Sequence, residues 1–226
     1  MRRLLAVLNM LGLTMVVFAA TMAVPTAVAA WGGDDALDAF VDGLLVALAI
    51  GLVLWAGTRR GRCELRPRDG FLLVSLVWVV LPALATIPLL IYFHRAGTPL
   101  GFTDAYFEAM SGLTTTGATI LSGLDKLPAS INVWRATMIW VGGMGILVLA
   151  VAVLPLLGVG GHQVFRAETP GPMKDEKLTP RIAGTAKALY AVYFGLSVLC
   201  LLAYRAAGLD WFEAWCHMAT TMGLGG

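Results

Sequence analysis

The chain has 226 residues, of which 58% are hydrophobic and 13% are charged, and its formal net charge is +2. A water-soluble surface needs about twice that charged fraction, so the composition excludes a soluble globular protein. The three cysteines, Cys63, Cys200 and Cys216, are too far apart for a CxxC metal or redox motif and indicate no disulfide framework.

Several segments are apolar over about 20 residues or more, which is the length that crosses a hydrocarbon core roughly 30 Å thick. We predict membrane spans at 4–30, 36–57, 71–93, 132–157 and 182–204. The first span follows two arginines, as the apolar segment of a cleaved signal peptide does. Its apolar run is longer than the usual run of about 7–15 residues in a signal peptide, which favours a retained span. Pro82 and Pro88 are expected to kink the third span. The glycines of the fourth, Gly142, Gly143 and Gly145, are interpreted as close helix packing rather than a hinge.

Two further apolar segments, 102–113 and 209–221, are too short to cross the membrane. Each has acidic residues near its start and a run rich in threonine and glycine behind it. Non-helical backbone at membrane depth is tolerated only where it is buried in protein or lines a water-filled path, so we predict two re-entrant half-helices whose loops line a pathway. The acidic residues are interpreted as caps of the helix starts, with cation concentration at the outer mouth as the alternative. They are Asp104, Glu108, Asp210 and Glu213.

Basic residues concentrate on one side of this topology. They are Arg2, Arg3, Arg59, Arg60, Arg62, Arg66, Arg68, Arg166, Lys174, Lys177, Arg181 and Lys187. The positive-inside rule assigns that side to the cytoplasm and both half-helices to the outer side. The opposite side holds Arg95, Lys126, Arg135 and Arg205. Lys126 and Arg135 are interpreted as anchors at the membrane interface.

The order of span, half-helix, Thr/Gly loop and span occurs once complete, at 71–157, and begins again at 182. Phe107-Glu108-Ala109 matches Phe212-Glu213-Ala214, and Thr115-Thr116 matches Thr220-Thr221 at the same offset. The register then slips, since Gly117 would pair with Met222. Chance similarity between two amphipathic stretches is the alternative, and the shared topology favours a true repeat.

The run SGLTTTGAT at 111–119 follows the first half-helix directly. A filter for a dehydrated cation needs stacked backbone carbonyls that replace the hydration shell. Glycine permits the unusual φ/ψ angles of such a run. Threonine can add a hydroxyl oxygen, and the negative C-terminal end of the half-helix favours a cation nearby. A polar turn between two helices is the alternative for this run taken alone, and the half-helix before it favours a filter.

Several stretches carry a family resemblance. They are SGLTTTGAT at 111–119, WVGGMGI at 140–146, the segment from Leu154-Pro155 to Gly160-Gly161, RAETPGP at 166–172, and Arg181-Ile182 with TAK at 185–187. In order, along essentially the whole chain, they resemble the membrane subunit of Trk potassium uptake systems. The resemblance implies four span–pore-helix–span repeats around one pore, preceded by two extra helices. Each repeat contributes a filter strand with a key glycine, which would be Gly117 in the first repeat and Gly226, or alternatively Gly225, in the second.

The combined interpretation is an all-α membrane protein, not an enzyme, whose polytopic helices carry re-entrant pore half-helices and filter loops. Its predicted parts are a two-helix unit at 1–66, a first repeat at 67–157, a cytoplasmic connector at 158–181 and a truncated second repeat at 182–226. The predicted function is potassium uptake through a carbonyl-lined filter, in which the backbone of Thr115, Thr116 and Gly117 binds K⁺. The full set of filter residues is Thr114, Thr115, Thr116, Gly117, Ala118, Gly225 and Gly226.

The same resemblance implies a multi-pass protein of the bacterial inner membrane, with K⁺ and membrane lipid as partners, no nucleic acid, and no cofactor besides the transported ion. We expect a homodimer when the protein is full length, and a nucleotide-binding regulatory subunit on the side of residues 166–181. The early end of the chain is expected to mark a partial transporter, with a non-conducting assembly subunit as the alternative. A membrane enzyme is disfavoured because the predicted spans hold almost no clustered His, Cys or acidic residues.

Overall fold

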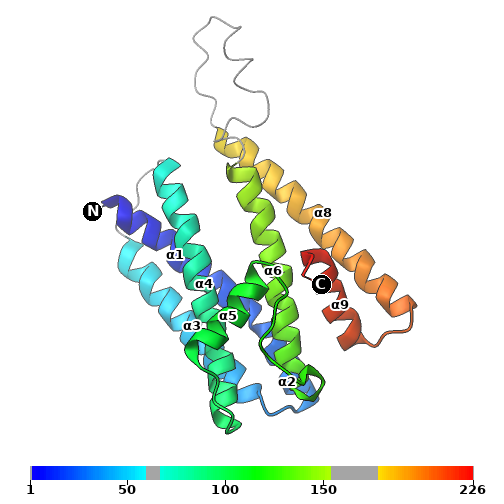
Figure 1. The fold of residues 1–226 in the computed structure, drawn as a ribbon. Helices are drawn as coiled ribbons and strands as arrows, with labels where there is room; N and C mark the ends of the chain where they lie inside the picture. The colour runs from blue at the N-terminus through cyan, green and yellow to red at the C-terminus, as the bar shows by residue number, and fades with distance from the viewer. Residues whose placement is uncertain (1, 60–66, 154–177, 226) are drawn as a thin grey trace, which may run out of the picture.

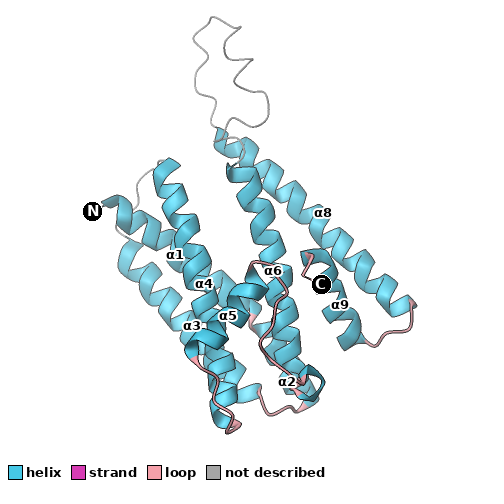
Figure 2. Cartoon of the chain, viewed as in Figure 1, coloured by secondary structure: helices cyan, strands magenta, loops and turns pink. Residues whose placement is uncertain are grey.

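The structure is a computed structural model that describes residues 2–59, 67–153 and 178–225. In those ranges every regular element is a helix and no strand occurs (Figure 1, Figure 2). The helices are α1 (Arg2–Thr21), α2 (Ala23–Gly32), α3 (Leu37–Thr58), α4 (Pro67–Arg95), α5 (Phe102–Leu113), the short 3-10 helix η2 (Leu124–Lys126), α6 (Ala129–Val153), α8 (Leu178–Ala206) and α9 (Trp211–Gly223). The predicted all-α class is confirmed.

Four helical segments of the described chain are long and apolar enough to cross a membrane. They are Arg3–Gly32, Leu37–Thr58, Arg68–Arg95 and Gly184–Ala206, with mean hydropathies between 1.8 and 2.4, and they correspond to four of the predicted spans. α6 covers most of the remaining predicted span, 132–157. Its 25 residues are about 37 Å long at about 1.5 Å per residue. Its predicted last residues, 154–157, lie outside the described residues. Pro82 and Pro88 both lie inside α4, which continues past them as one helix.

The first predicted span is broken rather than continuous. α1 ends at Thr21 and α2 begins at Ala23, with Met22 in a turn between them. Pro25 accounts for the break, because it has no N–H to donate to the carbonyl four residues earlier, that of Thr21. Met22 and Pro25 are both buried, so the break is packed into the bundle.

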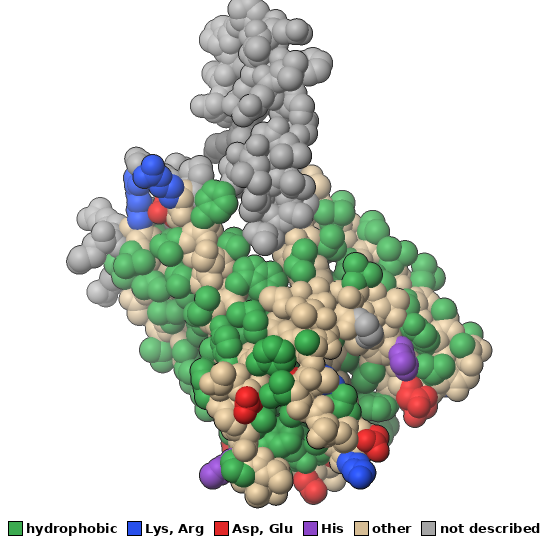
Figure 3. Space-filling model, viewed as in Figure 1, with side chains coloured by type: hydrophobic (Ala, Val, Ile, Leu, Met, Phe, Trp, Pro, Cys, Tyr) green, Lys and Arg blue, Asp and Glu red, His purple; other side chains and the backbone are tan. Residues whose placement is uncertain are grey.

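The helix ends separate the charges of the molecule. The start of α1, the end of α3, the start of α4, the end of α6 and the start of α8 lie at one end of the bundle (Figure 1). Arg3, Arg59 and Arg68 belong to these helix ends, whereas Arg95 closes α4 at the opposite end. Hydrophobic side chains cover much of the visible face between the two ends (Figure 3). The described part of the chain therefore has the charge separation that the sequence predicts.

α6 lies at the centre and joins two packed groups of helices. On one side, a hydrophobic core unites it with α1, α3, α4 and α5. Trp134 of α6 is fully buried there, with its ring centroid 5.8 Å from that of Phe18 and 6.3 Å from that of Phe40, and its indole N–H donates to the carbonyl of Ala85 at 3.1 Å. On another side, Ala136 and Trp140 pack with α8 and α9 in a smaller cluster.

The half-helices α5 and α9 do not span the bundle. They have 12 and 13 residues, or about 18–20 Å at about 1.5 Å per residue, which is well short of a hydrocarbon core roughly 30 Å thick. Both lie beside the middle of α6, and the chain ends there after α9 (Figure 1). The two predicted re-entrant half-helices are therefore present, with the second beginning at Trp211 instead of residue 209.

Candidate functional site: two half-helices and their loops

The two half-helices end in the same backbone motif. In the first, the N–H of Thr116 donates to the carbonyl of Ser111 at 2.9 Å, and the N–H of Thr115 donates to that of Gly112 at 3.0 Å. In the second, Gly225 donates to Thr220 at 3.0 Å and Leu224 to Thr221 at 3.2 Å. This pair of bonds is the Schellman motif. Its left-handed residue is Thr115 in one half-helix and Leu224 in the other, each with φ of 57°.

The shared motif sets a repeat register that differs from the predicted one. It pairs Ser111 with Thr220 and Thr116 with Gly225, whereas the sequence matches pair Thr115 with Thr220. The N-caps obey the same structural register, since Gly101 precedes α5 and Asp210 precedes α9. The Phe-Glu-Ala match is therefore out of register by four positions. The two half-helices therefore share their terminal motif, but the matching triplets do not occupy equivalent positions.

The two matched glutamates accordingly have different surroundings. Glu213 is in the first turn of α9 and forms a capping box with Asp210, in which the N–H of Glu213 donates to the Asp210 carboxylate at 2.7 Å. This confirms the capping interpretation for that pair. Asp104 is exposed in the first turn of α5, whose N-cap residue, Gly101, has no side chain to form a cap bond. Glu108 lies in the second turn of α5 and is 3% exposed, so it is not a cap.

The loop after α5 has a run of unpaired carbonyls. Within the described residues, the carbonyls of Thr114, Thr115, Thr116 and Gly117 accept no hydrogen bond. The next carbonyl, that of Ala118, accepts the Ser111 hydroxyl at 2.6 Å. Buried carbonyls in proteins are nearly always paired, and these four residues are at least partly exposed. The run can therefore offer its oxygens to an ion or to water.

The loops of the two half-helices meet at their glycines. Gly117 has φ of +74°, a conformation that favours glycine, and a Cβ built on it would overlap the carbonyl of Gly225. The backbones of the two loops thus approach more closely than any side chain would allow. This contact brings together the predicted filter residues 114–118 and Gly225. Gly226, the remaining predicted filter residue, lies outside the described residues.

Two adjacent glycines of α6 support the ends of both half-helices. A Cβ on Gly142 would overlap the carbonyl of Leu113, the last residue of α5. A Cβ on Gly143 would lie 3.2 Å from the Cα of Gly223, the last residue of α9, and 2.6 Å from the hydroxyl oxygen of Tyr193. The predicted close packing is confirmed for these two. At Gly145 the nearest atoms, those of Trp78, are 4.0 Å from a built Cβ, so that position is not tightly packed.

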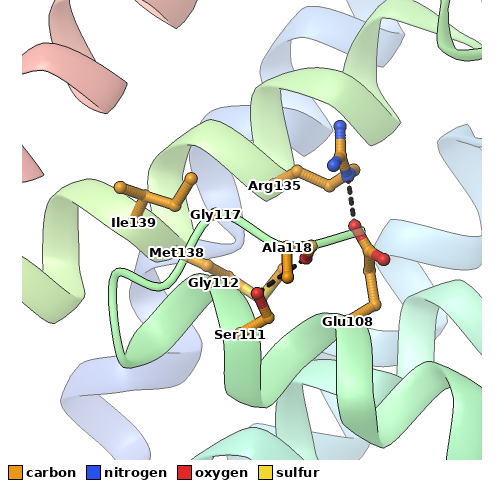
Figure 4. Close-up of a pocket in the computed structure, with 8 residues that line it drawn as sticks. All are labelled: Glu108, Ser111, Gly112, Gly117, Ala118, Arg135, Met138 and Ile139. Atoms are coloured by element: carbon orange, nitrogen blue, oxygen red, sulfur yellow. Dashed lines mark hydrogen bonds and ion pairs between the residues drawn. The ribbon is translucent and has the colours of Figure 1, made fainter. Parts of the chain in front are cut away.

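A buried ion pair lies behind the first loop. Arg135 of α6 donates from Nε to the Glu108 carboxylate at 2.6 Å, and the exposed fractions of the two side chains are 19% and 2%. The same carboxylate accepts the Thr119 hydroxyl at 2.9 Å and the N–H of Ile120 at 3.2 Å. Arg135 and Glu108 approach the loop from its two sides, around a cavity of about 20 Å³ (Figure 4). A cavity of this size has room for about one water molecule.

The sequence interpretation missed this pair. It treated Arg135 as an interfacial anchor, but the side chain is three-quarters or more buried and paired with Glu108. A signal was available, because Glu108 lies on the same face as Ala105, Ala109 and Gly112, all of which are buried. A charged residue on a buried apolar face at membrane depth needs a partner, and Arg135 is the nearest arginine in the following helix.

These features define the class: a multi-pass helical membrane protein with two re-entrant half-helices whose C-terminal loops meet beside a central helix. A family model described as TrkH, cation transport protein, matches residues 36–226. The chain belongs to this family, which is a family of transport proteins rather than enzymes.

Similar proteins cover nearly the whole chain. It is 49% identical over 221 residues to the Trk system potassium uptake protein TrkH of Escherichia coli (strain K12), and 48% identical over 220 residues to that of Halomonas elongata. These alignments cover 98% and 97% of this chain and 45% of each relative. The crystal structure of the potassium transporter TrkH from Vibrio parahaemolyticus matches with a TM-score of 0.84 and 41% identity, over 99% of this chain and 44% of that one. The chain thus spans a little under half the length of these relatives.

Proposed function

We propose that this chain is part of a potassium uptake transporter and that the loop after α5 supplies one strand of its selectivity filter. The names of its relatives support the ion, since they are potassium uptake proteins at 48–49% identity. The observation that carries the proposal is local: four consecutive carbonyls, from Thr114 to Gly117, without a hydrogen-bond donor in the described chain.

The chemistry follows from what a monovalent cation loses on entering a membrane. Its hydration shell must be replaced by oxygen ligands, and backbone carbonyls in a row supply them. The half-helix α5 ends at Leu113, directly before the run. Its C-terminal end carries a partial negative charge, which attracts a cation. In this proposal Thr115, Thr116 and Gly117 bind K⁺ through their carbonyls, Thr114 lies at one end of the row, and Ala118 at the other is held by Ser111.

The second loop is proposed to supply the next strand. In the structural register Thr116 pairs with Gly225, so the residue equivalent to Gly117 is Gly226. This favours Gly226 as the key glycine of the second strand, with Gly225 in close contact with Gly117. We further propose a bacterial inner-membrane location with lipid around the spans. For the whole protein we propose a homodimer with a nucleotide-binding regulatory subunit near residues 166–181, a segment that lies almost entirely outside the described residues.

The test is substitution of Gly117 in the complete gene product, expressed in a host that lacks its own potassium uptake systems. Gly117→Ala and Gly117→Asp are expected to abolish growth at low potassium and ⁸⁶Rb⁺ uptake, because any side chain there overlaps the Gly225 carbonyl. Membrane levels of each variant are measured by immunoblot.

Gly97→Ala is the matched control. Gly97 has the same φ of +74°, but a Cβ on it meets nothing within 4 Å. It therefore imposes the same backbone strain without the contact, and uptake is expected to persist. Wild-type uptake by both Gly117 variants would show that the filter assignment is wrong.

A further inference from the structure

We propose that Glu108 and Arg135 are positioning residues of the first filter loop, and that this buried ion pair sets how well the transporter distinguishes K⁺ from Na⁺ although neither residue touches the ion. The proposal rests on the proposed function. Its basis is the way in which the pair and its neighbours hold the loop on both sides of Gly117.

The loop is attached at points that flank Gly117. On its N-terminal side, the N–H of Thr116 donates to Ser111. On its C-terminal side, Ala118 accepts the Ser111 hydroxyl, while the Thr119 hydroxyl and the Ile120 N–H donate to Glu108. Gly117 is the only residue between these attachments. Its carbonyl direction is therefore set by how firmly both flanks are held.

The loop is held by two side chains of α5, Ser111 and Glu108. The Glu108 carboxylate cannot hold its position alone. It is almost completely buried, and a buried charge is stable only when it is paired and fully hydrogen-bonded. Arg135 supplies the countercharge from α6, at 2.6 Å. The helix that carries Arg135 also supports the end of α5 at Gly142. The pair thus connects the loop to the same rigid helix that fixes the half-helix, so displacement of either charge is expected to move the loop.

The matching position of the second half-helix holds a different residue. In the structural register the position equivalent to Glu108 is His217, whose ring packs against that of Tyr204 with centroids 5.5 Å apart and planes tilted by 33°. The end of the second half-helix packs instead against Ile139 of α6, whose side chain lies 2.5 Å from a Cβ built on Gly223 and 2.7 Å from one built on Gly225. Neutralising Glu108 therefore loosens one strand of the filter while leaving the other supported.

Another ion pair of the chain serves as a control. Arg95 donates to Asp42 at 2.8 Å, a geometry close to that of Arg135 and Glu108, but the two side chains are 51% and 47% exposed. Exposed pairs contribute little to stability, and this one does not contact the loop. It allows the effect of losing an ion pair to be separated from the effect of losing this one.

The experiment measures K⁺ uptake and its inhibition by Na⁺ in the complete gene product, in the same uptake-deficient host, for Glu108→Gln and Arg135→Gln. We expect the KM for K⁺ to rise by about tenfold, as for residues that orient the ligands of a metal ion. The ratio of the Na⁺ inhibition constant to the KM for K⁺, called the Na⁺ to K⁺ ratio below, is expected to fall by about the same factor. The double variant is expected to show less than the sum of the two effects, because the two residues act as a pair. Arg95→Gln is expected to keep wild-type values.

Thr119→Ala covers the case in which the charge variants fail to accumulate in the membrane. It removes the hydroxyl by which the loop contacts Glu108 and leaves the ion pair intact, so it is expected to lower discrimination in the same direction by a smaller factor. A merely structural role would change the amount of transporter and its maximal rate but neither KM nor the Na⁺ to K⁺ ratio. The proposal is wrong if Thr119→Ala leaves both the KM and the Na⁺ to K⁺ ratio unchanged. The same holds if Glu108→Gln accumulates in the membrane and leaves both unchanged. The filter assignment itself is judged separately, by Gly117→Asp.

Discussion

Thr115 and Leu224 hold a left-handed conformation that residues with a side chain seldom adopt. Threonine is β-branched, for which this region is an outlier, and such residues cost about 1–3 kcal/mol where they occur. Both occupy the same position of the Schellman motif, where glycine is usual. Strain at the same point of both loops, within two residues of the glycines that meet, indicates a backbone shape kept at the expense of stability.

The strain can be tested at Leu224, because this side chain is 88% exposed and has little packing to lose. Leu224→Gly is expected to stabilise the purified protein by about 1 kcal/mol, because glycine adopts positive φ without a clash. The measurement is the thermal unfolding midpoint in detergent. Leu199→Gly, at a similarly exposed position inside α8, should instead lower the midpoint, since glycine is unfavourable in a helix interior. A lower midpoint for Leu224→Gly would contradict the strain argument.

At the scale of the helices, α6 positions the loops after α5 and α9 more than these half-helices do themselves. Half-helices of 12 and 13 residues are marginal in isolation, because helices shorter than about 12–15 residues gain most of their stability from packing. Both pack on α6, which offers bare backbone at Gly142 and Gly143. Small residues allow this close approach between helices in a membrane, and it sets the depth at which each loop begins.

Gly142→Ala should therefore push α5 away from α6. We expect it to destabilise the protein by about 1–3 kcal/mol, as for overpacking of a core, and to reduce K⁺ uptake per molecule. Gly145→Ala is the matched control on the same helix, since its Cβ would have its nearest neighbour at 4.0 Å. Uptake rates normalised to membrane protein levels distinguish the two. Equal behaviour of both variants would mean that Gly142 does not set the position of the half-helix.

At the scale of the whole molecule, the N-terminal helices hold α6 at its start. Asp34, in the turn between α2 and α3, accepts the N–H of Ser130 at 3.0 Å and its hydroxyl at 3.1 Å. It thereby satisfies a free donor in the first turn of α6 from a residue far away in the chain, as an N-cap would. Together with Trp134 in the core, this contact joins the N-terminal helices to the helix that supports both half-helices.

Asp34→Ala is expected to lower the stability of the protein by about 1 kcal/mol, the usual effect of losing a helix cap. Because Asp34 is remote from the loops, the ratio of the Na⁺ inhibition constant to the KM for K⁺ should not change. Asp35→Ala, at the exposed neighbouring position, serves as the control and should leave the unfolding midpoint unchanged. A shift in ion preference with Asp34→Ala would contradict this purely structural role.

Much of this fold was predictable because it depends on local properties. Apolar length indicates the spans, and a segment too short to cross, followed by glycine and threonine, indicates each half-helix. Errors arose where residues of one half-helix had to be aligned with residues of the other. The matching Phe-Glu-Ala triplets suggested equivalence of Glu108 and Glu213, yet one is buried against α6 and the other caps α9. The break at Met22 was not predicted although Pro25 is in the sequence, because hydropathy does not depend on whether a residue has a backbone N–H to donate.

The amino-acid sequence alone determined that this protein crosses a membrane several times, carries two half-helices and resembles Trk transporters, since hydropathy and short motifs can be interpreted without knowing what touches what. Only the tertiary structure decided which residues meet: Gly117 with Gly225, Gly142 with Leu113, and Glu108 with Arg135. The physical reason is that these contacts join segments separated by many residues. Their geometry depends on how helices pack around α6, and no local pattern encodes that.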